Sequence, residues 1–151
     1  MRKLLIPFTL AVALFFASPL LKSSEHKTIA GNWVLDTSSA PQINGRQVTA
    51  GILTINYTHK NIEMSETLTF PDGDHSMDRN WKIDNHFHPV LGAGEGQTSA
   101  KWDRMTLTAD HEENGAHEMT RLSLSPDRQI LTQTTRRLDG STLILVWKRA
   151  G

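Results

Sequence analysis

The feature that most constrains this chain is a series of short alternating apolar and polar runs between Ile29 and Arg149. No stretch of this region repeats its apolar residues at helical spacing. The runs are rich in Thr, Ile, Val, Leu and Trp, which suit the half-buried surface of a β-sheet. The alternation therefore predicts nine strands, at residues 29–36, 51–59, 62–70, 76–84, 99–102, 105–112, 116–125, 129–138 and 141–149.

The segments between these runs are short and contain turn residues. Asp139-Gly140 predicts a tight hairpin because both residue types tolerate a positive φ, and Pro71-Asp72-Gly73 and Glu113-Asn114-Gly115 also predict turns. Connections of this length leave no room for crossover helices, so neighbouring strands should pair antiparallel. We predict an all-β, up-and-down antiparallel barrel of about eight to nine strands, with a sandwich as the alternative, because closure removes exposed sheet edges. Residues 37–50 and 85–98 are predicted to be loops.

The first 24 residues differ from the rest of the chain. Arg2 and Lys3 precede an apolar run over residues 4–17, which is shorter than the roughly 20 residues that a membrane-spanning helix needs. This pattern is typical of an export signal. We expect a signal peptide over residues 1–24, with its cleavage point left open, followed by a periplasmic or secreted barrel domain over residues 29–151. The chain has no cysteine, so this domain must be stable without disulfides.

The overall charge excludes one class of partner. Lys plus Arg and Asp plus Glu number 16 each, so no global field attracts nucleic acid or an anionic membrane. The four Trp form no stacking platform beside a basic track. We expect no nucleic-acid partner and no integral membrane anchor after cleavage, and we leave a protein partner open.

The two ends of the barrel region carry a familiar pair of motifs. Gly31-Asn32-Trp33 opens the first strand, and Val146-Trp147-Lys148-Arg149 ends the last. The pair resembles the calycin or lipocalin pattern, in which a Gly-x-Trp tryptophan near the closed end is covered by a basic side chain from the final strand. The resemblance implies that Gly31 and Trp33 close the barrel together with Lys148 or Arg149. We expect Arg149, because a guanidinium also stacks on an aromatic ring.

Three further segments, in the same order along the chain, extend the resemblance. Residues 84–92 (DNHFHPVLG), 101–106 (KWDRMT) and 125–132 (SPDRQILT) are similar to stretches of small exported bacterial lipocalin-like proteins. The resemblance covers nearly the whole barrel region. It implies a fold and a compartment, and because that family has no established activity, it implies no catalytic residue.

Two charged residues fall on strand faces that are otherwise apolar. Residues of one parity share a face of a strand, and this places Glu66 and Arg79 inward at similar distances from the turn between their strands. Two interior charges are costly unless they pair. We interpret them as the polar floor of a cavity for a small, mainly apolar ligand, which could be acidic. A purely structural ion pair, or a bulge that turns one side chain outward, is the alternative. The candidate ligand-binding residues are Tyr57, Met64, Glu66, Arg79 and Trp81.

The sequence leaves three classes of function open and favours a binding module. The alternative is a filled barrel that serves as a structural or protein-interaction domain in the cell envelope. The polar run at residues 133–137 (QTTRR) fits either a wet interior or an exposed strand. An enzyme would use Glu66, Arg79 or a histidine in the cavity, but no Gly-x-Ser-x-Gly elbow or glycine-rich phosphate loop is present. We expect no catalytic residue and no cofactor.

The seven histidines raise the question of a metal site. In an extended segment, His86 and His88 would place both rings on one side, and Asp84 or His75 could complete a zinc site. Histidines that are solvated or that pack on neighbours explain the same residues. We expect no bound metal.

Overall fold

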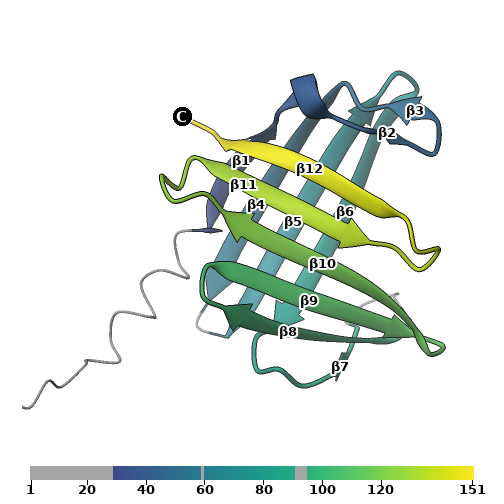
Figure 1. Ribbon diagram of the computed structural model, residues 1–151, viewed down its shortest axis with the longest axis vertical. Coiled ribbons are helices and arrows are strands. Elements are labelled where there is room, and N and C mark those ends of the chain that lie inside the picture. The colour runs from purple at the N-terminus through teal and green to yellow at the C-terminus, as the bar shows by residue number, and fades with distance from the viewer. Residues whose placement is uncertain (1–28, 59, 91–94) are drawn as a thin grey trace, which may run out of the picture.

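The computed structural model describes residues 29–58, 60–90 and 95–151 (Figure 1). The segment expected to be a signal peptide, residues 1–24, lies outside the described residues. None of the helices in the described ranges is long and apolar enough to cross a membrane.

Ten strands form one antiparallel sheet in the order β6-β5-β4-β1-β12-β11-β10-β9-β8-β7. In Figure 1, β8 to β12 lie in front and cross over β1, β4, β5 and β6 behind them. The end of β6 approaches β8, the neighbour of the two-residue edge strand β7: Ile83 forms a parallel bridge with Ala100, and the Asn85 amide donates to the Ala100 carbonyl over 3.0 Å. The sheet is thus a nearly closed barrel, which confirms the predicted all-β, up-and-down architecture. Its strands are β1 (Gly31–Leu35), β4 (Ala50–Thr58), β5 (Asn61–Phe70), β6 (Gly73–Lys82), β7 (His88–Pro89), β8 (Gln97–Asp103), β9 (Thr106–Glu113), β10 (Ala116–Leu124), β11 (Ile130–Arg136) and β12 (Thr142–Arg149).

The structure contains more strands than the eight to nine predicted. All nine predicted strands are present with shifted ends, and the additional ones come from the two predicted loops. Residues 37–50 form a short 3₁₀ helix (Thr37–Ser39) and a separate hairpin of β2 (Gln42–Ile43) and β3 (Arg46–Gln47). The hairpin turns at Asn44-Gly45, where φ is 52° and 75°, the positive values that a two-residue turn requires. The second loop contributes β7, which has only two residues.

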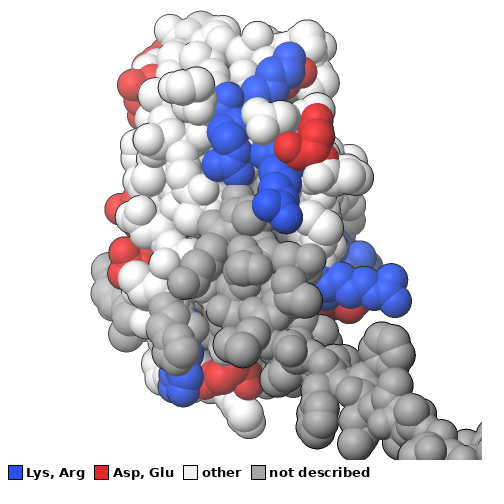
Figure 2. All heavy atoms as spheres, turned by 90° about the vertical axis from the view of Figure 1, so that its left-hand side faces the viewer, with Lys and Arg blue, Asp and Glu red and all other residues white. Residues whose placement is uncertain are grey.

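One end of the barrel is closed by the pair of motifs at the two ends of the sequence. The Arg149 guanidinium lies 4.2 Å from the centre of the fully buried Trp33 ring, and its Nη1 donates to the Ala30 carbonyl over 3.2 Å. Lys148 instead pairs with Asp36 at 2.8 Å. Gly31 has a φ of 130°, which favours glycine, and a Cβ there would lie 3.1 Å from Arg149 Nη1, closer than an ordinary contact. Figure 2 views this side of the molecule and shows basic side chains gathered in its upper half, with acidic ones beside them.

Behind this closure, side chains fill the barrel. The burial of each large apolar side chain contributes about 1.5–3 kcal/mol, so this packed region holds most of the hydrophobic stabilisation. Its fully or almost fully buried members are Ile29, Trp33, Leu53, Ile55, Ile62, Met64, Leu107, Leu122, Leu131, Leu145 and Trp147.

Candidate functional site

The other end of the barrel is hollow and contains two cavities. The hairpin cavity, under the β2–β3 hairpin, has a volume of about 210 Å³. The side cavity, between β6 and the strands β8 to β10, has a volume of about 320 Å³. Both are lined by Met77, Arg79 and Glu118, so they meet at Arg79. The hairpin cavity is also lined by Ile43, Arg46, Glu66, Leu68, Phe70, His75, Ser76, Gln133, Thr135, Arg137 and Leu143, and the side cavity by Asp78, Asn80, Trp81, Val90, Glu95, Thr98, Ala109, His111, Glu113 and Thr120.

A chain of buried polar groups separates the packed region from these cavities. Trp147 Nε1 donates to Gln133 Oε1 over 3.0 Å, and Gln133 Nε2 donates to Glu66 Oε2 over 2.8 Å. Arg79 Nη1 donates to the same Glu66 oxygen over a longer distance, 3.4 Å. Glu66 and Gln133 are only 6% and 2% exposed. The bond from Trp147 fixes the orientation of the Gln133 amide, which holds the Glu66 carboxylate in place independently of Arg79.

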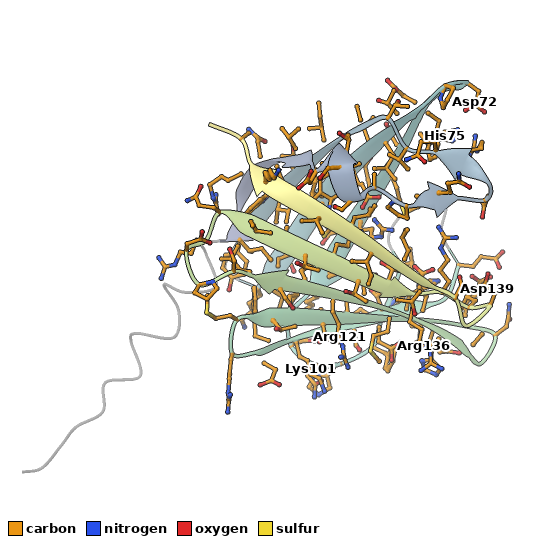
Figure 3. The ribbon with its side chains drawn as sticks, turned by 45° about the horizontal axis from the view of Figure 1, so that its top comes forward. Asp72, His75, Lys101, Arg121, Arg136 and Asp139 are labelled. Carbon is orange, nitrogen blue, oxygen red and sulfur yellow. The ribbon has the colours of Figure 1, made fainter. Side chains whose placement is uncertain are left out.

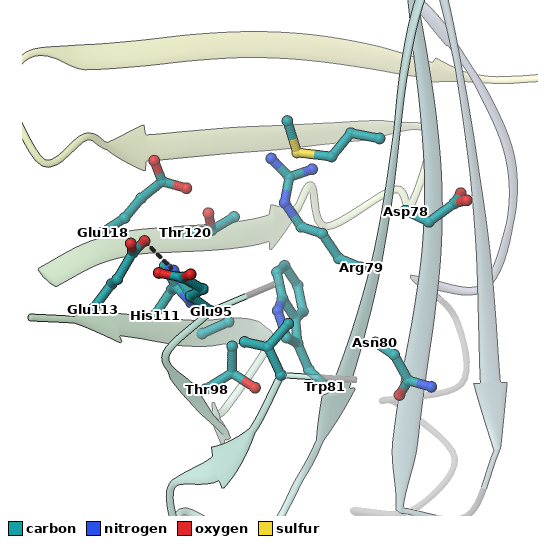
Figure 4. Close-up of a pocket in the computed structure, with 13 residues that line it drawn as sticks. Asp78, Arg79, Asn80, Trp81, Glu95, Thr98, His111, Glu113, Glu118 and Thr120 are labelled. Atoms are coloured by element: carbon teal, nitrogen blue, oxygen red, sulfur yellow. Dashed lines mark ion pairs between the residues drawn. The ribbon is translucent and has the colours of Figure 1, made fainter. Parts of the chain in front are cut away.

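Arg79 has hydrogen-bonding capacity that the protein itself does not use. It lies on β6, two residue pairs from Glu66 in register, since Met64 pairs with Arg79 and Glu66 with Met77. Its side chain is 15% exposed, and the bond to Glu66 is the only one it makes among the described residues. A guanidinium has five N–H donors in a planar fork. The remaining donors face the cavities, and Figure 4 shows Arg79 reaching from β6 toward β10.

Arg46 holds the β2–β3 hairpin over the hairpin cavity. Its guanidinium lies 4.5 Å from the centre of the Phe70 ring and donates to Asp72 Oδ2 over 2.8 Å. This bond holds the pKa of the Asp72 carboxyl below its ordinary value. The same Arg46 nitrogen lies 3.1 Å from His75 Nε2, and Figure 3 shows Asp72 and His75 together at this end of the barrel. These contacts form a latch between the hairpin and the start of β6.

The two cavities differ in charge. Three cations, Arg46, Arg79 and Arg137, line the hairpin cavity together with the carboxylates Glu66 and Glu118. Arg137 makes no ion pair or side-chain hydrogen bond with another described residue. An acidic group of a ligand would therefore find more positive than negative charge in the hairpin cavity.

The side cavity has the opposite balance. Its walls carry Glu95, Glu113 and Glu118 against Arg79, and the buried ring of Trp81 also lines it. Glu113 lies 3.7 Å from the His111 imidazole (Figure 4).

The residues predicted to bind a ligand fall into two groups. Glu66, Arg79 and Trp81 line the cavities, and the structure brings Glu66 and Arg79 together as a pair. Met64 is buried in the packed region, and Tyr57 packs against it; neither lines a cavity. Parity along a strand identifies inward residues but does not show where along the barrel the packing ends.

Sequence reasoning missed several residues that face the cavities. Gln133 shares the inward parity of β11 with Leu131, and Arg137 continues that parity just after the strand ends. The polar run that contains them fits either a wet interior or an exposed strand. Glu118 lies on β10 with the inward parity of the buried Leu122. A charge or amide on the parity of a buried leucine is the signal that could have found all three.

The histidines that suggested a metal site bond to protein groups. His88 Nε2 lies 2.9 and 3.0 Å from the two oxygens of Asp84, and His86 Nδ1 lies 3.7 Å from Asp84. The His88 contact lowers the pKa of the Asp84 carboxyl well below its ordinary value. His75 lies at the opposite end of β6, beside Arg46. In the part of the chain that the structure describes, no three His, Asp or Glu side chains form a cluster suited to a metal ion.

Comparison with known proteins shows the fold and not a family. No family model matches the sequence, and no curated protein matches it either. Solved structures do match. The fluorescent protein UnaG aligns with a TM-score of 0.60 at 11% identity, over 82% of this chain and 98% of that protein.

Two further neighbours have the same barrel. A fatty acid binding protein of Schistosoma mansoni, solved in complex with arachidonic acid, aligns with a TM-score of 0.57 at 11% identity, over 84% of this chain and 99% of that protein. An abundant heat soluble (SAHS) protein of Ramazzottius varieornatus aligns with a TM-score of 0.56 at 13% identity, over 82% and 96% of the two chains. The fold is therefore a calycin-type barrel, which agrees with the lipocalin-like architecture predicted from the sequence.

Proposed function

We propose that this barrel binds a small, mainly apolar ligand in its hollow end and that it does so without catalysis. One observation carries the proposal: two adjoining cavities meet at Arg79, whose guanidinium keeps most of its donors free for a ligand. A pocket of this kind orients its ligand by a few placed polar groups. The neighbour from Schistosoma mansoni is named for binding fatty acids, and its barrel is the one adopted here.

The polar head of the proposed ligand is an acid that enters the hairpin cavity. Arg79 and Arg137 supply N–H donors there, and a guanidinium binds a carboxylate through two parallel hydrogen bonds. The apolar part of the ligand contacts Leu68, Phe70 and Leu143, which line the same cavity. Glu66 keeps its hydrogen bond from Gln133, so ligand binding does not leave the Glu66 carboxylate without a partner.

The test is a titration of delipidated protein with palmitic acid, monitored by displacement of a fluorescent hydrophobic dye. Arg137→Gln should weaken palmitate binding about tenfold, the effect of one lost charge-assisted hydrogen bond of roughly 1.5 kcal/mol. Arg136→Gln is the matched control, because the neighbouring Arg136 is exposed on the outside of β11 (Figure 3). Equal affinities in both variants, or no saturable binding by the unaltered protein, would refute the proposal.

We further propose that the barrel acts outside the cytoplasm, in the periplasm or as a secreted protein. The support is the charged start and short apolar run of residues 1–24. N-terminal sequencing of the protein recovered from its own host should find a mature chain that begins between this segment and the first strand. Recovery of the intact N-terminus from the cytoplasm would contradict this proposal.

A second candidate function, a protein-interaction domain in the cell envelope, is favoured by one exposed surface. Ile52 and Val34 are register partners on β4 and β1, and they are 59% and 48% exposed. On β12, Lys148 is the register partner of Val34 on one side and of Ile130 on the other. The row of exposed residues that begins with Ile52 and Val34 therefore continues across β12 to Ile130 on β11. Ile52→Lys should abolish the co-purification of a protein partner if this row is an interface, and should leave palmitate binding unchanged.

A further inference from the structure

The side cavity contains an indole N–H that no protein group in the described ranges satisfies. Trp81 is only 5% exposed, and its indole lines the cavity. Its Nε1 donates to no acceptor in the described ranges. Figure 4 shows this nitrogen turned toward the β8–β9 side of the cavity. Because this N–H faces the cavity, a ligand that displaces water from the cavity must supply a hydrogen-bond acceptor for it.

The wall opposite Arg79 carries carboxylates whose hydrogen-bonding capacity is largely unused within the described chain. Glu118 makes no hydrogen bond or ion pair with the rest of the described chain, and Glu113 has only the 3.7 Å contact with His111. Ionised carboxylates accept hydrogen bonds and cannot donate them. Asp78 and Asn80 do not contribute to this wall, because their side chains point away from it (Figure 4).

These two requirements select one class of ligand group. A carboxylate would satisfy Trp81, but it would be repelled by Glu113 and Glu118. An ammonium would satisfy the carboxylates, but it has no lone pair for the Trp81 N–H. A hydroxyl group both donates and accepts, and it is neutral. It therefore satisfies Trp81 and a facing carboxylate at once.

We propose that the side cavity is a second polar subsite that binds a hydroxyl group of the ligand, so that the barrel prefers hydroxylated acids to unsubstituted ones. This inference rests on the proposed function, in which the acid occupies the hairpin cavity. The two cavities share Met77, Arg79 and Glu118, so a single ligand extends from one into the other past Arg79. The volume of about 320 Å³ in the side cavity leaves space for the hydroxylated segment.

The experiment compares palmitic acid, a series of its monohydroxylated analogues and hexadecylamine on the delipidated full-length protein. At least one hydroxylated analogue should bind about tenfold more tightly than palmitic acid, the effect of one or two added hydrogen bonds. Trp81→Phe keeps the ring and removes the N–H, and it should abolish this preference, measured as the ratio of the two affinities. Glu118→Gln, at a partly exposed position that tolerates substitution, should reduce the preference as well. Glu63→Gln, at an exposed position on the outer face of β5, is its control and should have no effect.

Each outcome bears on a different statement. If palmitic acid binds and no hydroxylated analogue binds more tightly, the second subsite is refuted and the proposed function stands. If the preference survives in both Trp81→Phe and Glu118→Gln, the subsite lies elsewhere and the inference fails. If hexadecylamine binds most tightly and loses affinity in Glu118→Gln, the side cavity is a cation site and the inference is also refuted. If none of the three ligand classes binds, the proposed function itself falls.

Discussion

The closed end and the hollow end of this barrel are built from the same strands but have opposite interiors. Along β11 the inward residues change from Leu131 to Gln133 and then Thr135, and along β5 they change from Met64 to Glu66. Where the inward residues are apolar, they interdigitate and fill the barrel. Beyond them Gln133 and Glu66 bond to each other, and the residues further along these strands line the cavities. The comparison shows that the packed apolar residues at the closed end stabilise the fold, whereas the hollow end, with its polar and charged interior residues, has room for a ligand.

The largest effect should come from breaking the closed end. Trp33→Ala removes a fully buried ring, its hydrogen bond to the Ile29 carbonyl at 3.0 Å and its contact with Arg149. Truncation of a buried tryptophan costs about 3–5 kcal/mol of unfolding free energy. Urea denaturation would measure this loss. A cost below about 1 kcal/mol would mean that the closed end is not the main source of stability.

A smaller loss should follow when one member of the buried pair at the hollow end is removed. Arg79→Leu leaves Glu66 with Gln133 as its remaining partner, and a buried charge with fewer hydrogen bonds costs about 1–3 kcal/mol. The double variant Glu66→Gln/Arg79→Leu should recover most of this loss, because no unpaired charge remains. If the loss of unfolding free energy in the double variant equals the sum of the losses in the two single variants, the two residues do not interact and their pairing does not contribute to stability.

Replacement of the cation at the closed end should lower the stability of the protein but not its affinity for a ligand at the hollow end. Arg149→Gln keeps a hydrogen-bonding side chain but removes the charge over the Trp33 ring, and such a cation–π contact contributes about 0.5–2 kcal/mol. The expected loss is of that size in urea denaturation, with palmitate affinity unchanged. A loss of affinity without a loss of stability would place the ligand at the closed end and overturn the division into two regions.

At the hollow end, the latch should matter more for exchange of ligand than for stability. Arg46→Gln removes an exposed ion pair with Asp72, and such pairs contribute about 0.2–1 kcal/mol. Because the hairpin is then held less firmly over its cavity, the rate of palmitate release should rise several-fold in stopped-flow fluorescence. An unchanged release rate would show that the ligand leaves by another path, such as the side cavity.

The smallest effect should be the acid dependence of the ion pair beside the closed end. The bond from Lys148 lowers the pKa of Asp36 from 3.8 to about 2. A carboxyl whose pKa is lowered by folding stabilises the native state above its unfolded pKa, and this contribution is lost as the pH falls from 3.8 toward 2. Asp36→Asn should therefore make unfolding less pH-dependent over this interval, as measured by thermal melts. A profile identical to that of the unaltered protein would contradict the lowered pKa.

Much of the fold could be predicted because its signals are local. Alternation placed nine strands, and residue types at turns such as Asn114-Gly115, where φ is 53° and 79°, fixed antiparallel neighbours. The missed hairpin at Asn44-Gly45 carries the same turn signal, but its strands have only two residues each and therefore no alternation to detect. The candidate site was predicted less completely. Glu66 and Arg79 lie on consecutive strands, whereas Gln133 meets Glu66 from 67 positions away along the chain.

The sequence by itself determined which residues form strands, how consecutive strands pair and which parity of each strand faces inward, because each of these depends on neighbours within a few residues. Only the tertiary structure decided that β6 and β8 nearly meet, that Arg149 rather than Lys148 covers Trp33, and that the interior is filled at one end and hollow at the other. These features depend on how side chains from distant strands share one volume. That volume exists only after the sheet has curved and closed.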